Sequence, residues 1–327
     1  MFIYSKNNKT KVTKLNINNI RIDWIDLTKG IAIFLMVCGH TSIPLPISNW
    51  IWSFHMPLFF IISGILFNAT KYPNFNLFIK KRGETLIIPY IIFSLITLLT
   101  IRDQTLQEWL YKGWINGCAL WFIPVLFFAE IFSYFIIRYI KSNCLILLTA
   151  ITIGTIGYGL YFFNIHFPYN IDVSFYASFF YLIGYISKNK IIHYPPKHTL
   201  AICLLIVNII LSQILPRTDM AWNNCGWYGL NAINAIGGTF AIILITKTYF
   251  DNIYATPIKL FFKWAGHNTI IILGLSQIIS TYIKIGFSYF FVPEIMNPFL
   301  RHIFLWIILY ILSIIIRKYF PKIIGQK

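Results

Sequence analysis

The sequence has too few charged residues to cover the surface of a water-soluble protein. Only 11% of its 327 residues are Asp, Glu, Lys or Arg, whereas 57% are hydrophobic and the mean hydropathy is +0.68. Soluble domains carry about 25% charged residues. We therefore exclude a single soluble core and expect most of the chain to lie in lipid. Ten spans of ~20 residues would match the apolar excess and leave no room for a folded soluble domain.

Cysteines and acidic residues are also scarce. The five cysteines contain no CxxC motif, so we do not expect a thiolate metal site. The 10 acidic residues stand against 27 Lys and Arg, which gives a net charge of +17. Such a protein would bind nucleic acid if its cations formed one patch, but they fall in short clusters between apolar runs, as in the cytoplasmic loops of membrane proteins. We expect membrane lipid, and no nucleic acid, as a partner.

The pattern of apolar runs predicts an all-α integral membrane protein, a bundle of about ten transmembrane helices with both termini in the cytoplasm. The runs lie at about 22–40, 50–67, 86–101, 119–137, 145–163, 173–187, 199–215, 229–246, 268–286 and 302–316. With a cytoplasmic N-terminus, 22 of the 27 cations fall inside, and cationic loops are disfavoured for translocation. The five outer cations are Arg102, Lys112, Arg217, Lys284 and Arg301.

The domain organisation follows from these runs. We expect residues 1–20 to be a disordered basic cytoplasmic tail, residues 21–318 to be the membrane domain, and residues 319–327 to be a second cytoplasmic tail. A signal peptide is disfavoured because Asp23 and Asp26 stand at the head of the first apolar stretch, which lacks a small-x-small cleavage site.

The first apolar run carries the most polar residues. It reads RIDWIDLTKGIAIFLMVCGH, from Arg21 to His40. Polar groups inside a membrane are costly, so they are candidates for function. Asp26 and His40 share one helix face, yet a separation of ~21 Å along the helix prevents a hydrogen-bonded dyad. We expect Asp26 to pair with Lys29, three residues on, or with a cation of the next cytoplasmic loop.

The second apolar run brings another histidine. It begins NWIWSFHMPLFFIISG, and an antiparallel return through a short loop should bring His55 to the depth of His40. Two histidines at one depth predict a polar crevice between the first two helices. On position alone, His40 fits an interfacial histidine bonded to the following turn equally well. We expect no metal, because no cysteine or carboxylate lies near in sequence to complete a ligand set.

Six sequence motifs occur in order through nearly the whole chain. They are RIDWIDLTKGIAIFLMVCGH, SFHMPLFFIISGILF, FIKKRGETLIIPY, LWFIPVLFF, FYLIGYISKN and FKWAGHNTIIIL. Together they resemble the membrane-bound acyltransferase-3 family, and best its fucose 4-O-acetylase-like branch. Members are bacterial ten-helix enzymes that O-acylate surface sugars. The resemblance implies a multi-pass protein of the bacterial inner (plasma) membrane that uses acetyl-CoA as acyl donor.

The resemblance also implies roles for individual residues. His40 matches the presumed catalytic histidine, with Asp26 and His55 as further catalytic candidates. The candidates for binding the donor are Arg82, Lys29 and Arg21. Two positions depart from the family pattern. Thr85 replaces the partner of Arg82 in an Arg-x-x-Arg motif, and residues 275–277 read Leu-Ser-Gln where many members have a late histidine.

Glu130 lies eleven residues into the fourth apolar run. A carboxylate at mid-bilayer depth is costly unless it is paired or protonated. One interpretation is a protonated Glu130 hydrogen-bonded to a neighbouring helix. The other is a residue that lines the acyl-transfer passage or relays the proton taken by His40.

Tryptophans are concentrated in the predicted outer half, although an aromatic belt alone would mark both interfaces. The outer ones are Trp50, Trp52, Trp109, Trp114, Trp121, Trp222, Trp227 and Trp306. Flat aromatic faces suit stacking against sugar rings. We therefore expect Trp114, Trp121 and Trp227 to contact a glycan acceptor. Cys118 and Cys225 also fall outside, where an oxidising compartment would allow a disulfide.

These observations predict a membrane O-acyltransferase. It would move an acyl group, in our expectation acetyl, from cytoplasmic acyl-CoA to a hydroxyl of a cell-envelope glycan or its lipid-linked precursor. A histidine near pKa ~6.5 suits the base that such a reaction needs. Direct transfer and an acyl-histidine intermediate both stay open. The alternative is a glycan or lipid-linked sugar transporter or flippase, although we see no internal repeat of the kind that transporters often carry.

Overall fold

The computed structural model describes residues 22–41, 43–100, 119–195, 197–250, 256–289 and 297–325. Over these ranges the chain is helical and contains no β-strand, only an isolated bridge between Asp219 and Asn224. The predicted all-α class is therefore confirmed. The predicted tail at residues 1–20 lies outside the described residues.

Each predicted apolar run coincides with a helix. In chain order the helices are α1 (Asp23–Gly39), α2 (Leu45–Leu66), α3 (Phe75–Arg82), α4 (Ile88–Thr100), α6 (Phe122–Tyr139), α7 (Asn143–Phe162), α8 (Ile171–His193), α9 (His198–Ile214), α10 (Tyr228–Ile245), α11 (Pro257–His267), α12 (Thr269–Ser288) and α13 (Asn297–Tyr319). A π turn at Gly83–Ile87 joins α3 to α4, and a second one at Thr246–Phe250 extends α10. The short helix α11 has no counterpart among the predicted runs.

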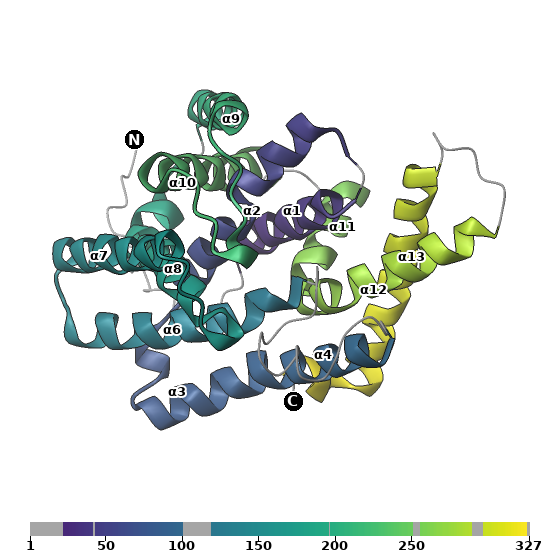
Figure 1. Cartoon of the computed structure of the whole chain (residues 1–327), viewed down its shortest axis with the longest axis horizontal. Coiled ribbons are helices and arrows are strands. Elements are labelled where there is room, and N and C mark those ends of the chain that lie inside the picture. Colours follow the sequence, from purple (N-terminus) through teal and green to yellow (C-terminus); the bar gives the residue numbers. More distant parts are fainter. Residues whose placement is uncertain are drawn as a thin grey trace, which may run out of the picture.

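Seven helical stretches in the described part are long and apolar enough to cross a membrane. They are Leu45–Leu66, Phe75–Thr100, Ala119–Tyr139, Asn143–Phe162, Tyr228–Phe250, Thr269–Ser288 and Phe299–Tyr319. Helices α1 and α9 have only 17 residues each, and α1 begins with two acidic residues. The number of ten spans and the cytoplasmic termini therefore stay predictions. Figure 1 shows α12 and α13 at one side of the remaining helices.

Glycines allow two pairs of helices to touch backbone to backbone. A Cβ on Gly266 of α11 would lie 1.8 Å from the carbonyl oxygen of Asp26 in α1, and one on Gly30 of α1 would lie 1.9 Å from that of Phe262. The same relation holds between Gly64 of α2 and the backbone of α8. Small residues at helix contacts are the usual means of close packing inside a membrane. These contacts fix α1 against α11 and α2 against α8.

Basic side chains satisfy helix C-termini at one end of the bundle. Lys188 donates from Nζ to the Phe67 carbonyl that follows α2, at 2.9 Å. Lys247 donates to the last carbonyls of α8, and Arg317 donates to the last carbonyl of α11. These cations pair with carbonyls that have no helical partner and complement the negative end of each helix dipole. Lys247 also lies over the ring of Trp24, which stands in the first turn of α1 together with Asp26. We therefore call this end of the bundle the Asp26 end.

We predict that Gly266→Ala and Gly159→Ala have effects of opposite sign on stability. The new methyl group at position 266 meets the α1 backbone, and overpacking of this kind costs about 1–3 kcal/mol or more. At Gly159 in α7 nothing lies within 4 Å of the new Cβ, and a helical alanine gains about 0.5–1 kcal/mol over glycine. Thermal unfolding of both purified variants checks this. Equal stability of the two would contradict the backbone contact.

Candidate active site

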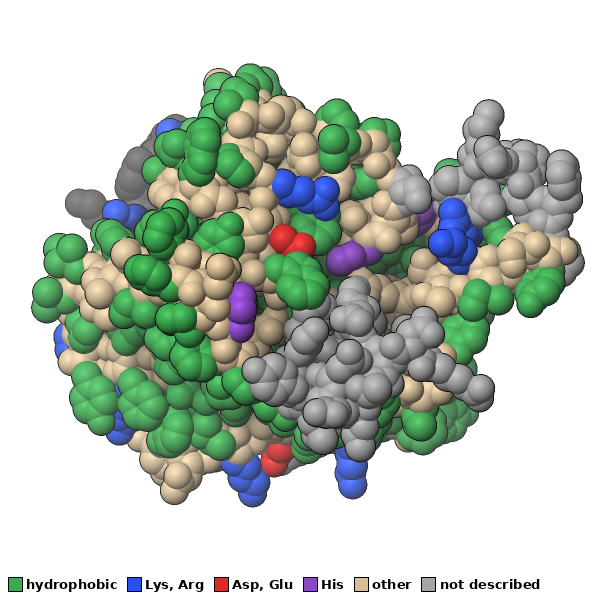
Figure 2. All heavy atoms as spheres, in the orientation of Figure 1, with side chains coloured by type: hydrophobic (Ala, Val, Ile, Leu, Met, Phe, Trp, Pro, Cys, Tyr) green, Lys and Arg blue, Asp and Glu red, His purple; other side chains and the backbone are tan. Residues whose placement is uncertain are grey.

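His40 follows directly after α1 and lines two cavities. Its backbone N–H closes the helix on the carbonyls of Met36 and Val37. The side chain is exposed, and the imidazole has no hydrogen bond with any of the described residues. It lines a cavity of about 150 Å³ and another of about 530 Å³. On the face in Figure 2, histidine and basic side chains surround a hollow beside the α12–α13 part of the molecule.

Trp52 of α2 joins the two predicted histidines. Its ring packs edge-on against His40 at 5.6 Å between centroids and against His55 at 5.7 Å. The indole Nε1 also donates to the carbonyl of Gly39, the last residue of α1, at 3.3 Å. His40 and His55 line the same smaller cavity. The predicted proximity of the two histidines is therefore confirmed. The Trp52 indole packs between their rings.

His55 is buried and has a fixed tautomer. Its Nδ1 lies 2.9 Å from the carbonyl oxygen of Ile51, one helical turn earlier. A carbonyl only accepts, so Nδ1 carries the proton. The neutral ring then keeps the lone pair on Nε2 as a hydrogen-bond acceptor for a group in the cavity.

The segment between α9 and α10 covers this site. Arg217 places its guanidinium 4.4 Å from the centroid of the Trp52 ring, a cation–π contact, and Thr218 donates to the Trp52 carbonyl at 3.2 Å. Asp219 accepts a bond from the N–H of Ala221 at 3.0 Å. Burial raises the pKa of Asp219, while the N–H bonds and the charge of Arg217 oppose that shift.

The predicted tryptophans occupy different environments. Trp121 is buried and lines the smaller cavity together with Trp222, whose side chain is exposed. Trp227 is exposed at the start of α10 and lines neither His40 cavity. Trp114 lies outside the described residues.

The structure describes one cysteine of the predicted pair, Cys225. Cys225 is buried as a free thiol that donates to the carbonyl of Asn223 at 3.3 Å. Cys118 lies outside the described residues, and the free thiol of Cys225 contradicts the predicted disulfide between the two.

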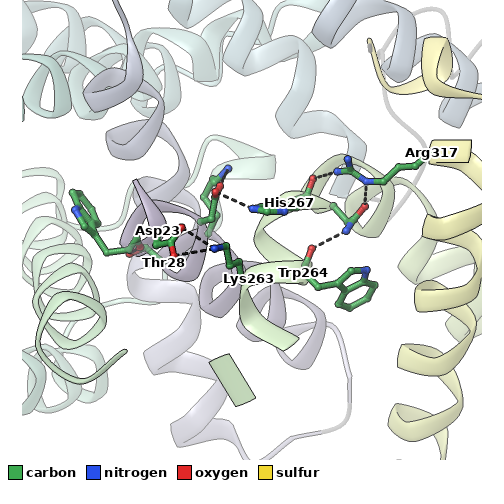
Figure 3. A network of polar contacts seen from close by, with 10 residues as sticks. Asp23, Thr28, Lys263, Trp264, His267 and Arg317 are labelled. Carbon is green, nitrogen blue, oxygen red and sulfur yellow. Dashed lines mark hydrogen bonds and ion pairs between the residues drawn. The ribbon is translucent and has the colours of Figure 1, made fainter. Parts of the chain in front are cut away.

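At the opposite end of α1, Asp26 anchors a network of three helices, in which Figure 3 labels His267 of α11 and Arg317 of α13. Its carboxylate binds Lys29 at 2.8 Å, as predicted, and the Nε2 of His267 at 3.0 Å. Arg317 of α13 in turn donates to the carbonyl of His267 and, at 2.6 Å, to Oδ1 of Asn268. Asp26 thus ties α1 to α11 and α13, away from His40. Arg21 lies outside the described residues.

Arg82 and Glu130 form a buried ion pair between α3 and α6. The Nε and Nη2 groups of Arg82 donate to the two carboxylate oxygens of Glu130, which is only 3% exposed. A bidentate pair of this type satisfies both charges without water. Neither of the two sequence interpretations of Glu130 included this partner. Tyr181 lies close enough to both groups to interact electrostatically, and its buried hydroxyl has no partner in the described part of the chain.

The sequence patterns did not single out Trp52, Arg217 or His267. Trp52 lies three residues before His55 on α2, so the two side chains are on the same helix face. This spacing in the sequence could have identified Trp52 as a neighbour of His55. His267 stands within the motif FKWAGHNTIIIL. Arg217 gave no local signal, because its position depends on how a connecting segment folds over α2.

Comparison with known proteins finds one family. A model described as an acyltransferase domain matches residues 22–318. The comparison with curated proteins and the comparison with solved structures gave no match.

We predict strong coupling between Arg82 and Glu130. Glu130→Ala leaves a buried guanidinium without its counter-charge and should cost about 3–5 kcal/mol, and Arg82→Ala should cost a similar amount. The double variant should lose about 1–3 kcal/mol less than the sum, because it leaves no unpaired charge. Thermal or denaturant unfolding of the three variants measures this, with exposed Lys81→Ala as control. Strictly additive losses would exclude a direct pair.

Proposed function

We propose, since this chain belongs to the acyltransferase-3 family, that it is a membrane O-acyltransferase whose reaction takes place at His40. The family match covers 297 of the 327 residues, counted from 22 to 318. We further propose the fucose 4-O-acetylase-like branch, acetyl as the acyl group, and the bacterial inner membrane as the location. The acceptor in this proposal is a cell-envelope glycan or its lipid-linked precursor.

The observation that carries the proposal is the position of His40 between two cavities. An imidazole without a hydrogen-bond partner among the described residues is available to take the proton of an acceptor hydroxyl. The oxygen then attacks the thioester carbonyl, the C–S bond breaks, and the proton passes to the leaving thiolate. An acyl-histidine route would use the same ring as nucleophile.

The smaller cavity supports binding of the acceptor next to this base. It is lined by Trp52, Trp121 and Trp222, whose flat faces suit the C–H faces of a sugar ring. His55 adds a fixed acceptor nitrogen at the same wall. We assign the outer tryptophans Trp114 and Trp227 to more distant parts of the acceptor.

The donor fits the Asp26 end of the bundle. A cavity of about 450 Å³ at the turn between α6 and α7 is lined by Arg138 and Lys141, which suit the phosphates of CoA. Arg82 has its Nη1 group outside the ion pair with Glu130, and Lys29, which is paired with Asp26, is 21% exposed. We propose that Arg82, Lys29 and Arg21 assist donor binding. The thioester of CoA ends a long flexible arm, so its phosphates and its reacting carbonyl can lie at different ends of the bundle.

Asp26 fits a positioning role in this scheme. It does not contact His40, and its carboxylate is satisfied by Lys29 and His267. By fixing α1 against α11 it sets the place at which α1 ends, and therefore where His40 lies.

We predict that His40→Ala lowers acetyl transfer by about 10²–10⁴-fold, the usual contribution of a general base. Membranes would receive labelled acetyl-CoA and isolated envelope glycan, and label in the glycan would be counted. His193→Ala is the matched control, because His193 is an exposed histidine at the end of α8. Unchanged labelling together with lost glycan export would contradict the proposal and indicate a transporter.

A further inference from the structure

The larger His40 cavity is lined by cations from three separate elements. Arg217 comes from the segment before α10, Lys284 from α12 and Arg301 from α13. No Asp or Glu is among the residues that line this cavity in the described part of the chain. The sequence places five cations on the outer side, and these three are the ones that fall within the described ranges. Cations far apart in sequence therefore converge on one hollow next to His40.

Two of these cations form no ion pair with the described residues. Arg217 and Lys284 make no ion pair or hydrogen bond with the described residues, although Arg217 has its cation–π contact with Trp52. Asp219 is close enough to Arg217 to interact with it electrostatically, but it lines the smaller cavity and not the larger one. Arg217 and Lys284 are exposed, so water weakens their repulsion, but like charges that share one hollow still repel each other. Their convergence without a structural partner therefore indicates a bound counter-charge.

Other groups complete the lining as an anion site. Arg217 is held against the Trp52 ring, so its guanidinium is oriented before a ligand arrives. The Nε2 of His302 lies 3.1 Å from the hydroxyl of Thr41, and Ser280 and Thr281 also line the cavity. The Thr281 hydroxyl already donates to the carbonyl of Gln277, at 2.9 Å. A guanidinium fork matches the two oxygens of a carboxylate or phosphate, and the Ser280 hydroxyl is a further donor type for such a ligand.

We propose that this cavity binds a phosphate or carboxylate carried by the acceptor saccharide. The inference rests on the proposed function and specifies its substrate class: an anionic saccharide whose charged group lies in the larger cavity while its reacting hydroxyl lies at His40. The volume of about 530 Å³ is within the range of small-molecule sites. In the proposed function the phosphates of the donor bind elsewhere, at Arg138 and Lys141 of the Asp26 end.

The test uses the full-length protein in membrane vesicles with labelled acetyl-CoA. Saccharides and lipid-linked saccharides extracted from cells that carry the gene are separated by anion exchange into neutral and anionic fractions. The wild type should label an anionic fraction. Phosphatase treatment of that fraction, and separately the reduction of its carboxylates, should show which anion is required.

The same assay is repeated with Lys284→Gln, Lys284→Arg and the control Lys190→Gln, an exposed lysine at the Asp26 end of α8. Lys284→Gln should raise the apparent KM for the acceptor about tenfold, the loss expected for one charge-assisted hydrogen bond, with the KM for acetyl-CoA unchanged. Lys284→Arg should retain most of the wild-type activity, and Lys190→Gln should behave as wild type.

Three results would overturn the inference. His40-dependent labelling of the neutral fraction would do so while leaving the proposed function intact. A higher KM for acetyl-CoA in Lys284→Gln, with the acceptor KM unchanged, would assign the cations to the donor. Absence of label in every fraction with the wild type would remove both the inference and the proposed function.

Discussion

The contacts of the Trp52 indole determine the geometry around His40. One ring meets His40, His55 and the guanidinium of Arg217, and its N–H holds the last carbonyl of α1. The site is therefore assembled by aromatic packing, while the two nitrogens of the His40 imidazole have no hydrogen-bond partner in the described part of the chain. A rigid two-torsion side chain holds several partners at little cost in conformational entropy, which suits a position that several elements share.

At the Asp26 end, by contrast, the carboxylates and the last helix carbonyls described above are bound by side chains of the protein itself. Asp26 has Lys29 and His267, Glu130 has Arg82, and the last carbonyls of several helices have lysine or arginine partners. Unsatisfied charges and carbonyls are expensive where water is absent. The contrast is informative: Lys188, Lys247 and Arg317 at the Asp26 end donate to helix carbonyls, whereas Arg217 and Lys284 at the His40 end have no such partner among the described residues.

Local sequence patterns predicted what depends on local geometry. The apolar runs gave the helices, the three-residue spacing gave the Asp26–Lys29 pair, and the short loop after α1 gave the approach of His55 to His40. Contacts between distant elements were not predicted. Glu130 and Arg82 are 48 residues apart, and Asp26 and His267 are 241 residues apart. No periodicity carries such information, since it depends on which helices become neighbours. The sequence predicted about ten membrane spans, and seven helical stretches in the described part are long and apolar enough to be spans; α1 and α9 are short, and α8 is rich in serine and tyrosine.

The glycine contact between α1 and α11 limits how this enzyme can adjust during a catalytic cycle. Because the backbones touch at Gly30 and Gly266, the two helices cannot slide along each other without a steric clash. Any tilt of α1 must carry α11 with it, as one rigid body. Fine adjustment of the His40 imidazole is therefore left to rotation about its two side-chain torsions and to the short turn behind it.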